Sequence, residues 1–356
     1  MFNKYKSIYL LIALIIILAA CGPKGTQETP EPIVETLVVT DEMQATPVDE
    51  IPVATPTPEP AEPRTLVVCL DVEPGEIYYI YNFNYPRSVQ EALFDGPIDS
   101  NSFAFQPVIL EKLPSLADGD AILTTITVSE GDTVVDANFQ LVSLDPAADP
   151  PIMLTPAGGG DPVPYQGGDF ELDQMTVTFK LLPGLKWSDG VPLTTMDSVY
   201  AFNLAEEWGS WLTERTATYE AIDDLTFQWT GVPGFRDPLY STFMVGPLSE
   251  HIWGQYSGDE LKEMEEFYRA PLGWGPYMLE EWVEGESISL RKNPHYFRAA
   301  EGLPKFDRVI FRITGKNPNT NIAALLAGEC DIVTSGSHAF LDGQIETLLN
   351  CTRPVS

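Results

Sequence analysis

Histidine and basic residues are scarce in this sequence, and each shortage excludes a class of function. The 356 residues include 3 His and 20 Lys+Arg against 52 Asp+Glu, which gives a formal net charge of −32. His251, His295 and His338 lie far apart, without the spacing of a zinc site or a catalytic triad, so we expect no metal, no cofactor and no enzyme activity. No cluster of Lys or Arg is present to neutralise phosphates, and nucleic acid is therefore excluded as a partner.

The apolar run at the N-terminus is too short to cross a membrane. Residues 8–20 carry almost only apolar or small side chains, and as a helix they span roughly 20 Å, whereas the hydrocarbon core is ~30 Å thick. The basic start before this run and the sequence LAACG at residues 18–22 resemble a lipoprotein signal with its lipobox, whose cysteine is diacylated. We predict a signal peptide over residues 1–21, lipidation of Cys21 and an extracytoplasmic location on the membrane. A plain secretory signal is the alternative.

After the signal segment the chain has few cysteines, and its first part has too few apolar residues to form a core. Cys69, Cys330 and Cys351 are an odd set, which leaves at least one of them without a partner in the chain. Residues 22–64 contain nine prolines, and such a composition cannot bury enough apolar surface to offset the entropy of ordering. We predict a Pro/Thr/Glu-rich disordered tether over this range.

Alternating strands and helices are predicted after the tether, which indicates the α/β class. Residues 65–70 form a short apolar run typical of a buried strand, and residues 175–181 alternate apolar and polar side chains as a half-buried strand does. Asp197 is expected to be the N-cap of a helix, and Gly328 to follow the last helix at its C′ position. The other predicted elements are strands at 287–291, 308–313 and 331–334, and helices at 88–94, 259–267 and 319–327.

The glycine-rich sequence at residues 157–161 invites comparison with a phosphate-binding loop. It lacks the preceding strand, the following helix and the lysine that such a loop requires, so we predict a surface loop. It lies in a stretch from about residue 121 to residue 173 that we interpret as a local elaboration of unassigned architecture.

Three segments occur in an order that is itself informative. The first is VTFKLLPGLKWSDGVPLT at residues 177–194. The second comprises GWGPYML at 273–279, Trp282 and LRKNPHYF at 290–297, and the third is AALLAGECDI at 323–332. Together they resemble the family 5 extracellular solute-binding proteins, the peptide, dipeptide and nickel receptors of ABC importers. Their turns, helix caps and aromatic residues have structural explanations, so the motifs indicate the fold rather than ligand contacts.

The resemblance implies a bilobed α/β receptor of the periplasmic-binding-protein type II class, similar to peptide-binding proteins, that closes on a solute. In the implied organisation the first lobe covers residues 65–271, with an inserted domain at about 97–225, and the second lobe begins over residues 272–356. Family members continue farther after the second motif. We therefore expect the second lobe to be incomplete and the chain to be truncated at its C-terminus.

The resemblance also suggests where a solute is bound. The loop after the first strand lies where family members present contacts from the first lobe, and the residues just beyond 334 are a second candidate. Aromatic faces and amide groups suit an extended peptide, because they combine apolar area with hydrogen bonds. The candidate ligand-binding residues are Tyr81, Asn82, Phe83, Asn84, Tyr85, Ser335 and Ser337.

We therefore expect a monomeric, lipid-anchored receptor that binds oligopeptides or dipeptides and delivers them to the transmembrane subunits of an ABC permease. Oligosaccharides, nickel complexes and opines are alternative solutes. An envelope hydrolase on a similar frame, and a structural or sensory lipoprotein, are alternatives from other classes. The hydrolase would need a nucleophile close to a base, and the sequence contains no Gly-x-Ser-x-Gly motif.

Overall fold

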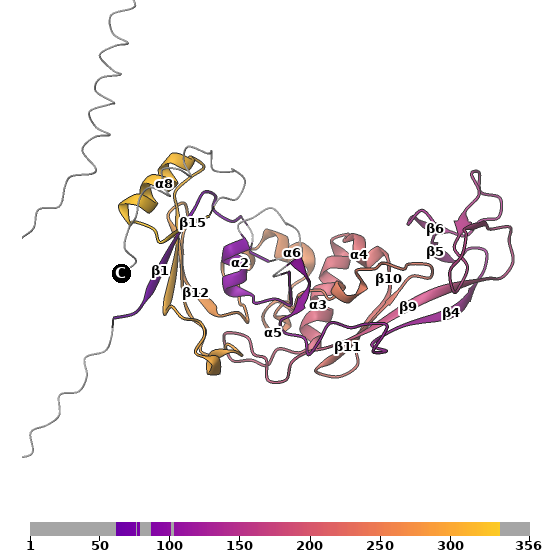
Figure 1. The fold of residues 1–356 in the computed structure, drawn as a ribbon, viewed down its shortest axis with the longest axis horizontal. Coiled ribbons are helices and arrows are strands. Elements are labelled where there is room, and N and C mark those ends of the chain that lie inside the picture. Colours follow the sequence, from indigo (N-terminus) through magenta and orange to yellow (C-terminus); the bar gives the residue numbers. More distant parts are fainter. Residues whose placement is uncertain (1–61, 76, 79–86, 101–102, 335–356) are drawn as a thin grey trace, which may run out of the picture. The chain divides into compact units, whose positions relative to one another are not determined.

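The computed structural model describes residues 62–75, 77–78, 87–100 and 103–334 (Figure 1). Most of the strands in these ranges belong to two sheets. The other strands form three short hairpins, and helices connect the strands. No helix within the described ranges is both long and apolar enough to cross a membrane.

The first sheet has five strands in the order β12-β13-β14-β1-β15. Its strands are β1 (Thr65–Leu70), β12 (Tyr277–Val283), β13 (Ser287–Lys292), β14 (Arg308–Ile313) and β15 (Ile332–Thr334). β1 is parallel to β14 and to β15, whereas β12, β13 and β14 pair antiparallel. The strands predicted at 65–70, 287–291, 308–313 and 331–334 are confirmed as β1, β13, β14 and β15. β12 was not predicted as a strand, although part of the second motif lies in it.

Helix α8 (Pro318–Ala327) connects β14 to β15 and packs on β1 and β15. The helix begins where the Asn317 side chain accepts a hydrogen bond from the Asn319 backbone N–H (3.0 Å). It ends at Gly328, whose φ of 73° lies in the left-handed region that favours glycine. The glycine predicted after this helix is thus confirmed.

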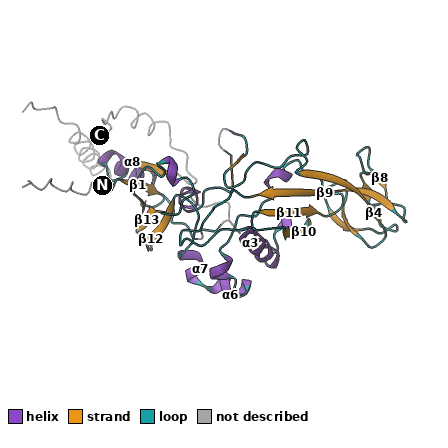
Figure 2. Ribbon diagram, turned by 90° about the horizontal axis from the view of Figure 1, so that it is seen from below, coloured by secondary structure: helices purple, strands orange, loops and turns teal. Residues whose placement is uncertain are grey.

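The second sheet is antiparallel throughout and has the order β10-β11-β9-β4 (Figure 2). Its strands are β4 (Ala121–Val128), β9 (Phe170–Lys180), β10 (Thr216–Ala221) and β11 (Thr226–Gly231). In β9, Met175, Val177 and Phe179 are buried, while the alternate threonines are partly exposed. The alternation predicted here is confirmed, and the strand begins earlier than predicted, at Phe170.

Residues 121–173, whose architecture was unassigned, lengthen this sheet and add two hairpins. β5 (Thr133–Val135) pairs with β6 (Leu141–Ser143), and β7 (Met153–Leu154) pairs with β8 (Val163–Pro164). They share a small core of their own, whose buried members are Val128, Val134, Leu144, Leu154, Tyr165 and Leu172. This core lies where β4 and β9 continue past the last residue pair between β9 and β11.

Most of the remaining helices are short, and the helix predicted over 259–267 is not continuous. They are α2 (Arg87–Leu93), α3 (Thr195–Glu207), α4 (Trp211–Glu214), α5 (Glu250–Trp253), α6 (Gly258–Glu263), α7 (Glu265–Arg269) and the 3-10 helices η2 (Tyr240–Thr242) and η3 (Ala299–Glu301); β2 (Ile98–Asp99) and β3 (Gln106–Pro107) form the third hairpin. The single helix predicted over 259–267 is divided at Met264, which has an extended backbone. Leu261 and Phe267 are both buried, and a continuous helix would place side chains six residues apart on different faces.

Strand pairing and the main buried cluster both extend across the domain limits that the resemblance implies. β1 pairs with β14 and β15, so strands from both sides of the boundary at residues 271 and 272 share one sheet. The inserted domain expected at about 97–225 ends before β11, which completes the second sheet. Leu70 and Phe311 of the first sheet belong to the same buried cluster as Phe179 and Trp229 of the second. The division into lobes at these limits stays a prediction.

A disulfide joins Cys69 of β1 to Cys330, two residues before β15, with a Cα–Cα distance of 5.8 Å. The apolar residues around it are Val67, Ala324 and Val333. Asp331 adds two backbone contacts: its N–H donates to the Val67 carbonyl oxygen, and its carboxylate accepts from the Val67 N–H, both at 2.8 Å. The attachment of α8 and β15 to β1 therefore relies on strand pairing, on these hydrogen bonds, on a very small core and on the disulfide.

Replacing both Cys69 and Cys330 with Ala should lower the free energy of unfolding by about 2–5 kcal/mol, because the bond closes a long loop in the unfolded chain. Chemical denaturation with and without a reducing agent measures the effect. The reducing agent should destabilise the wild-type protein to the level of the double variant and leave the double variant unchanged. Equal effects of the reducing agent on both proteins would contradict this role of the bond.

Candidate functional site

The carboxyl ends of the parallel strands mark the first candidate site. β14, β1 and β15 run in the same direction and end at Ile313, Leu70 and Thr334. In open α/β sheets ligands bind outside this edge, where the strands deliver their loops. Both candidate ligand-binding segments come after strands of this edge in the sequence: residues 81–85 follow β1 after an intervening stretch, and Ser335 and Ser337 follow β15.

Polar groups at this edge hold the strand ends in register. The Thr314 N–H donates to the Leu70 carbonyl oxygen (2.8 Å), and the Thr314 hydroxyl lies within hydrogen-bond distance of the same oxygen and of the Asn321 amide oxygen. Asn321 is buried at the start of α8. The Thr334 hydroxyl donates to the Cys69 carbonyl oxygen (3.4 Å). The edge is therefore built from groups that bond to one another across three strands and a helix.

Glu73 fixes the direction of the chain as it leaves β1. Its carboxylate accepts hydrogen bonds from Trp282 Nε1 (2.7 Å) and from the Gly285 N–H (3.0 Å), in and after β12. Arg269 of α7 approaches the same carboxylate at 3.6 Å and lies over the Trp282 ring, 5.0 Å from its centroid. A partly buried carboxylate that bonds to an indole and a backbone amide is a strong positional restraint. The sequence did not indicate this residue, because its partners lie more than 190 residues away.

The residues on either side of the first candidate segment are also held. Burial raises the pKa of the Tyr78 hydroxyl to about 12, and its oxygen accepts hydrogen bonds from Trp253 Nε1 and from the Leu272 N–H, both at 3.2 Å. Beyond the segment, Gln90 of α2 donates to the Ile77 carbonyl oxygen (2.9 Å). All predicted site residues lie outside the described residues: Cys21, Tyr81, Asn82, Phe83, Asn84, Tyr85, Ser335 and Ser337. The anchors around them are what the structure describes.

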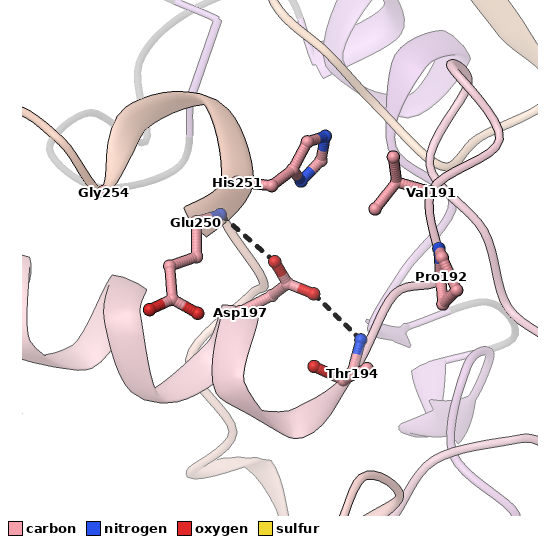
Figure 3. Close-up of a pocket in the computed structure, with 7 residues that line it drawn as sticks. All are labelled: Val191, Pro192, Thr194, Asp197, Glu250, His251 and Gly254. Carbon is pink, nitrogen blue, oxygen red and sulfur yellow. Dashed lines mark hydrogen bonds between the residues drawn. The ribbon is translucent and has the colours of Figure 1, made fainter.

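A pocket of about 340 Å³ lies beside the turn of the first motif (Figure 3). Its lining residues are Val191, Pro192, Thr194, Asp197, Glu250, His251 and Gly254. They come from the turn that precedes α3, from the first turn of α3 and from α5 with the glycine after it.

Asp197 is the central acceptor of this pocket. Its carboxylate accepts hydrogen bonds from the backbone N–H groups of Thr194 (2.8 Å) and Glu250 (3.1 Å) and from Trp187 Nε1 (3.3 Å). The N-cap of α3 is Thr194, and Asp197 is the third helical residue in a capping box. The prediction of Asp197 as the N-cap is therefore wrong, because its side chain reaches back to the residue before the helix.

The electrostatics of the pocket also indicate a structural role. Burial raises the pKa of the Asp197 carboxyl group, and the three donors oppose this shift without cancelling it. His251 Nε2 lies 2.8 Å from Asp189 Oδ2 in the same turn. Within the described ranges no group of three or more His, Cys, Asp or Glu side chains is arranged to hold a metal ion. These hydrogen bonds connect the turn to α3 and α5, so the polar groups around the pocket stabilise the turn and the two helices.

The glycine-rich loop holds a carboxylate of the protein itself. The Gly158 N–H lies 3.1 Å from both carboxylate oxygens of Asp173, and Arg236 Nη1 lies 3.0 Å from one of them. Asp173 is buried in β9, so its charge is matched at this place by a guanidinium and a backbone amide. The loop thus binds an internal anion, which agrees with the prediction against a phosphate-binding loop.

Comparisons with known proteins place these motifs in context. The sequence matches the model for bacterial extracellular solute-binding proteins, family 5 middle, over residues 169–347, half of the chain. Oligopeptide-binding protein AppA of Bacillus subtilis is 30% identical over 162 residues, which cover 42% of this chain and 28% of that protein. A protein of Brucella ovis named as an ABC transporter peptide-binding protein is 30% identical over 165 residues, 44% of this chain and 30% of that protein. The chain spans less than a third of the length of these relatives.

Solved structures show the same fold. An oligopeptide-binding protein of Thermus thermophilus with a bound pentapeptide has a TM-score of 0.53 at 18% identity, covering 75% of this chain and 43% of that one. A periplasmic oligopeptide-binding protein of Thermotoga maritima with bound mannohexaose has a TM-score of 0.51 at 17% identity, covering 81% and 44%. At these identities the likeness establishes the fold alone. The predicted α/β fold of the bilobed type II periplasmic binding proteins is thereby confirmed.

Asp197→Asn should destabilise the protein by about 1–3 kcal/mol, because an amide nitrogen would face one of the three N–H donors. In the folded wild-type protein the Asp197 carboxyl group keeps its proton to a higher pH than in the unfolded chain, where it releases the proton near the ordinary pKa of 3.8. Wild-type stability therefore falls as the pH rises through the raised pKa, and the gap to the variant narrows. Chemical denaturation at several pH values measures the difference in free energy of unfolding between the two proteins. The other titratable groups are the same in both, so their contributions cancel in this difference.

Asp259→Asn is the matched control for this comparison, because the Asp259 side chain is exposed at 94%. It should leave the stability nearly unchanged at every pH. A gap between the wild type and Asp197→Asn that widens with rising pH would show that the donors outweigh burial and would contradict the assigned cause.

Proposed function

The chain belongs to the bacterial extracellular solute-binding proteins of family 5, and from this membership we propose that it captures oligopeptides or dipeptides outside the cell and delivers them to the permease of an ABC importer. The match over residues 169–347 is the observation that carries the proposal. Relatives named as peptide-binding proteins support peptides as the solute. Family membership places the chain outside the cytoplasm, and binding without catalysis is the mode of action that we assign to it.

The proposed peptide site is the carboxyl edge of the parallel strands β14, β1 and β15. The residues that we assign to peptide contact follow β1 and β15, and the anchors described above restrain both neighbours of the first segment. Asn82 and Asn84 would supply amide hydrogen bonds to a peptide backbone, and the neighbouring aromatic rings would supply apolar area. An extended peptide presents both kinds of group along its length, which a compact solute does not.

We further propose that lipid on Cys21 holds the receptor at the membrane and that it acts as a monomer. A diacylated cysteine provides the two chains that stable anchoring requires, since each buried CH₂ contributes only about 0.8 kcal/mol. The transmembrane subunits of the permease are the proposed partner. An anchored receptor would meet them by diffusion along the same membrane.

Calorimetric titration of the full chain in mild detergent with a pool of di- to hexapeptides should give saturable binding. Combined Asn82→Ala and Asn84→Ala substitutions should weaken binding about tenfold, because two amide hydrogen bonds would be lost. Asn138→Ala removes an exposed amide from the turn between β5 and β6 and should bind as the wild type does. No saturable heat with the pool, or equal weakening by the control, would contradict peptide binding at the proposed site.

Cys21→Ser should release the protein from the membrane fraction, because no acyl chain could be attached to residue 21. Fractionation of expressing cells and incorporation of labelled palmitate measure the two consequences. The wild type should carry the label and sediment with membranes, and the variant should do neither. Wild-type protein that takes up no labelled palmitate, or a Cys21→Ser variant that takes up as much label as the wild type, would refute the lipid anchor.

A further inference from the structure

The outer edge of β4 differs from every other long sheet edge in the described chain. An exposed edge strand offers unpaired N–H and C=O groups, and soluble proteins usually block such edges with charge, proline, bulges or short length. β4 has eight residues, AILTTITV, with no charge and no proline, and it pairs with β9 alone over eight consecutive residue pairs without a bulge.

The other edges of the two main sheets carry these protections. β10, at the opposite edge of the same sheet, has a bulge between Thr216 and Thr218 and an exposed Glu220. β12 has a bulge and the adjacent charges Glu280 and Glu281, and β15 is only three residues long. The contrast between β4 and β10 within one sheet shows that the missing protection is local to β4.

The side chains of β4 are exposed on both faces of the strand. Ile122 is 50% exposed and Leu123 is 36% exposed, although they point to opposite faces, and Thr124, Thr125 and Thr127 are exposed as well. The Ala121 N–H at the start of the strand already donates to the Ser115 carbonyl oxygen (3.1 Å). An added strand would cover the exposed side chains and satisfy the remaining backbone groups of this edge at the same time. This is the geometry of β-strand addition, in which main-chain hydrogen bonds supply affinity and alternate side chains supply selectivity.

The surrounding charge indicates what kind of strand fits. Residues 113–179 contain no Lys, Arg or His, and acidic residues lie at both ends of β4: Asp118 and Asp120 before it, Glu130 and Asp132 after it. Lys112 offsets the first pair through contacts of 3.2 and 2.6 Å. Antiparallel pairing of β4 with a second copy would bring the acidic ends together, and like charges that face each other across strands are destabilising. A strand with basic ends has the complementary charge.

We propose that the free edge of β4 binds an extended polypeptide segment whose centre is uncharged and rich in β-branched residues and whose ends are basic, adding a fifth strand to the second sheet. This edge is distinct from the proposed peptide site, which lies at the carboxyl ends of strands in the first sheet. A change in β4 therefore tests this surface without altering the residues assigned to that site.

The peptide KKVTITVTKK is the probe for this edge, and EEVTITVTEE, with the same centre, is its charge control. Hydrogen exchange of the full chain should show slower exchange over residues 121–128 when the lysine-ended peptide is added and no change with the glutamate-ended one. Thr124→Lys should weaken binding of the probe at least about tenfold, because a charged side chain in the middle of an edge strand opposes pairing with the uncharged centre of the probe. Thr124→Ser should bind as the wild type does.

Thr218→Lys on β10 is the matched control, since it adds the same charge to the opposite edge of the same sheet. Binding unaffected by Thr218→Lys and lost with Thr124→Lys supports the proposal. Three results would overturn it: no protection of residues 121–128 by the probe, equal weakening by both lysine variants, or protection that appears with protein concentration alone, which would identify a second copy as the occupant. Thermal denaturation of each variant confirms that it is folded before binding is compared.

Discussion

The first sheet depends on a pairing between the start and the end of the described chain. β1 lies between β14 and β15, and the Arg64 N–H beside it donates to Asp307, 243 residues away. Because closing so long a loop costs conformational entropy, the contacts at this junction must offset that cost. Asp307 and Asp331 each accept a backbone N–H from residues 64 and 67 at 2.8 Å, and the disulfide at Cys69 makes the junction covalent. The edge from which the proposed peptide site is built exists only once this junction has formed.

The acidic composition has a structural use beyond surface charge. With few Lys and Arg available, several carboxylates that hold the fold accept hydrogen bonds from backbone N–H groups and tryptophan indoles. Asp197 bonds to two backbone amides and Trp187, Glu73 bonds to Gly285 and Trp282, and Asp331 bonds to the β1 backbone. A carboxylate with two oxygens can join two elements, so these residues connect turns, helices and strands. The excess of acid therefore contributes to the fold as well as to solubility.

The predictions that succeeded concern features written in short stretches of sequence. The apolar run of β1, the alternation in β9 and the glycine after α8 follow from side-chain periodicity and from the left-handed backbone at Gly328. The predictions that failed or were missing concern distant partners. Asp197 was predicted to be the N-cap because an aspartate before a helical pattern is typical of that position. Its bonds to Trp187 and Glu250, which depend on the folded turn and on α5, could not be read from the sequence. Strand β4 was missed because its apolar residues and threonines do not alternate, and β5 to β8 were missed because each has only two or three residues. Glu73 could not be identified, since only the fold brings it to Trp282.

The two sheets offer an extended chain different kinds of contact. In the first sheet, β12 is bulged and Glu280 is tied to Arg308 at 2.7 Å, while β15 is short and held by the disulfide. Neither edge presents a long row of free backbone groups, which is why we propose that a ligand reaches this sheet at the strand ends, where loops and side chains would determine selectivity. In the second sheet, β4 presents its backbone directly, and selectivity there would come from the uncharged strand and its acidic flanks. Contacts through loops can adapt to many solutes, whereas a backbone edge accepts only a strand, which is why we assign the two surfaces to different partners.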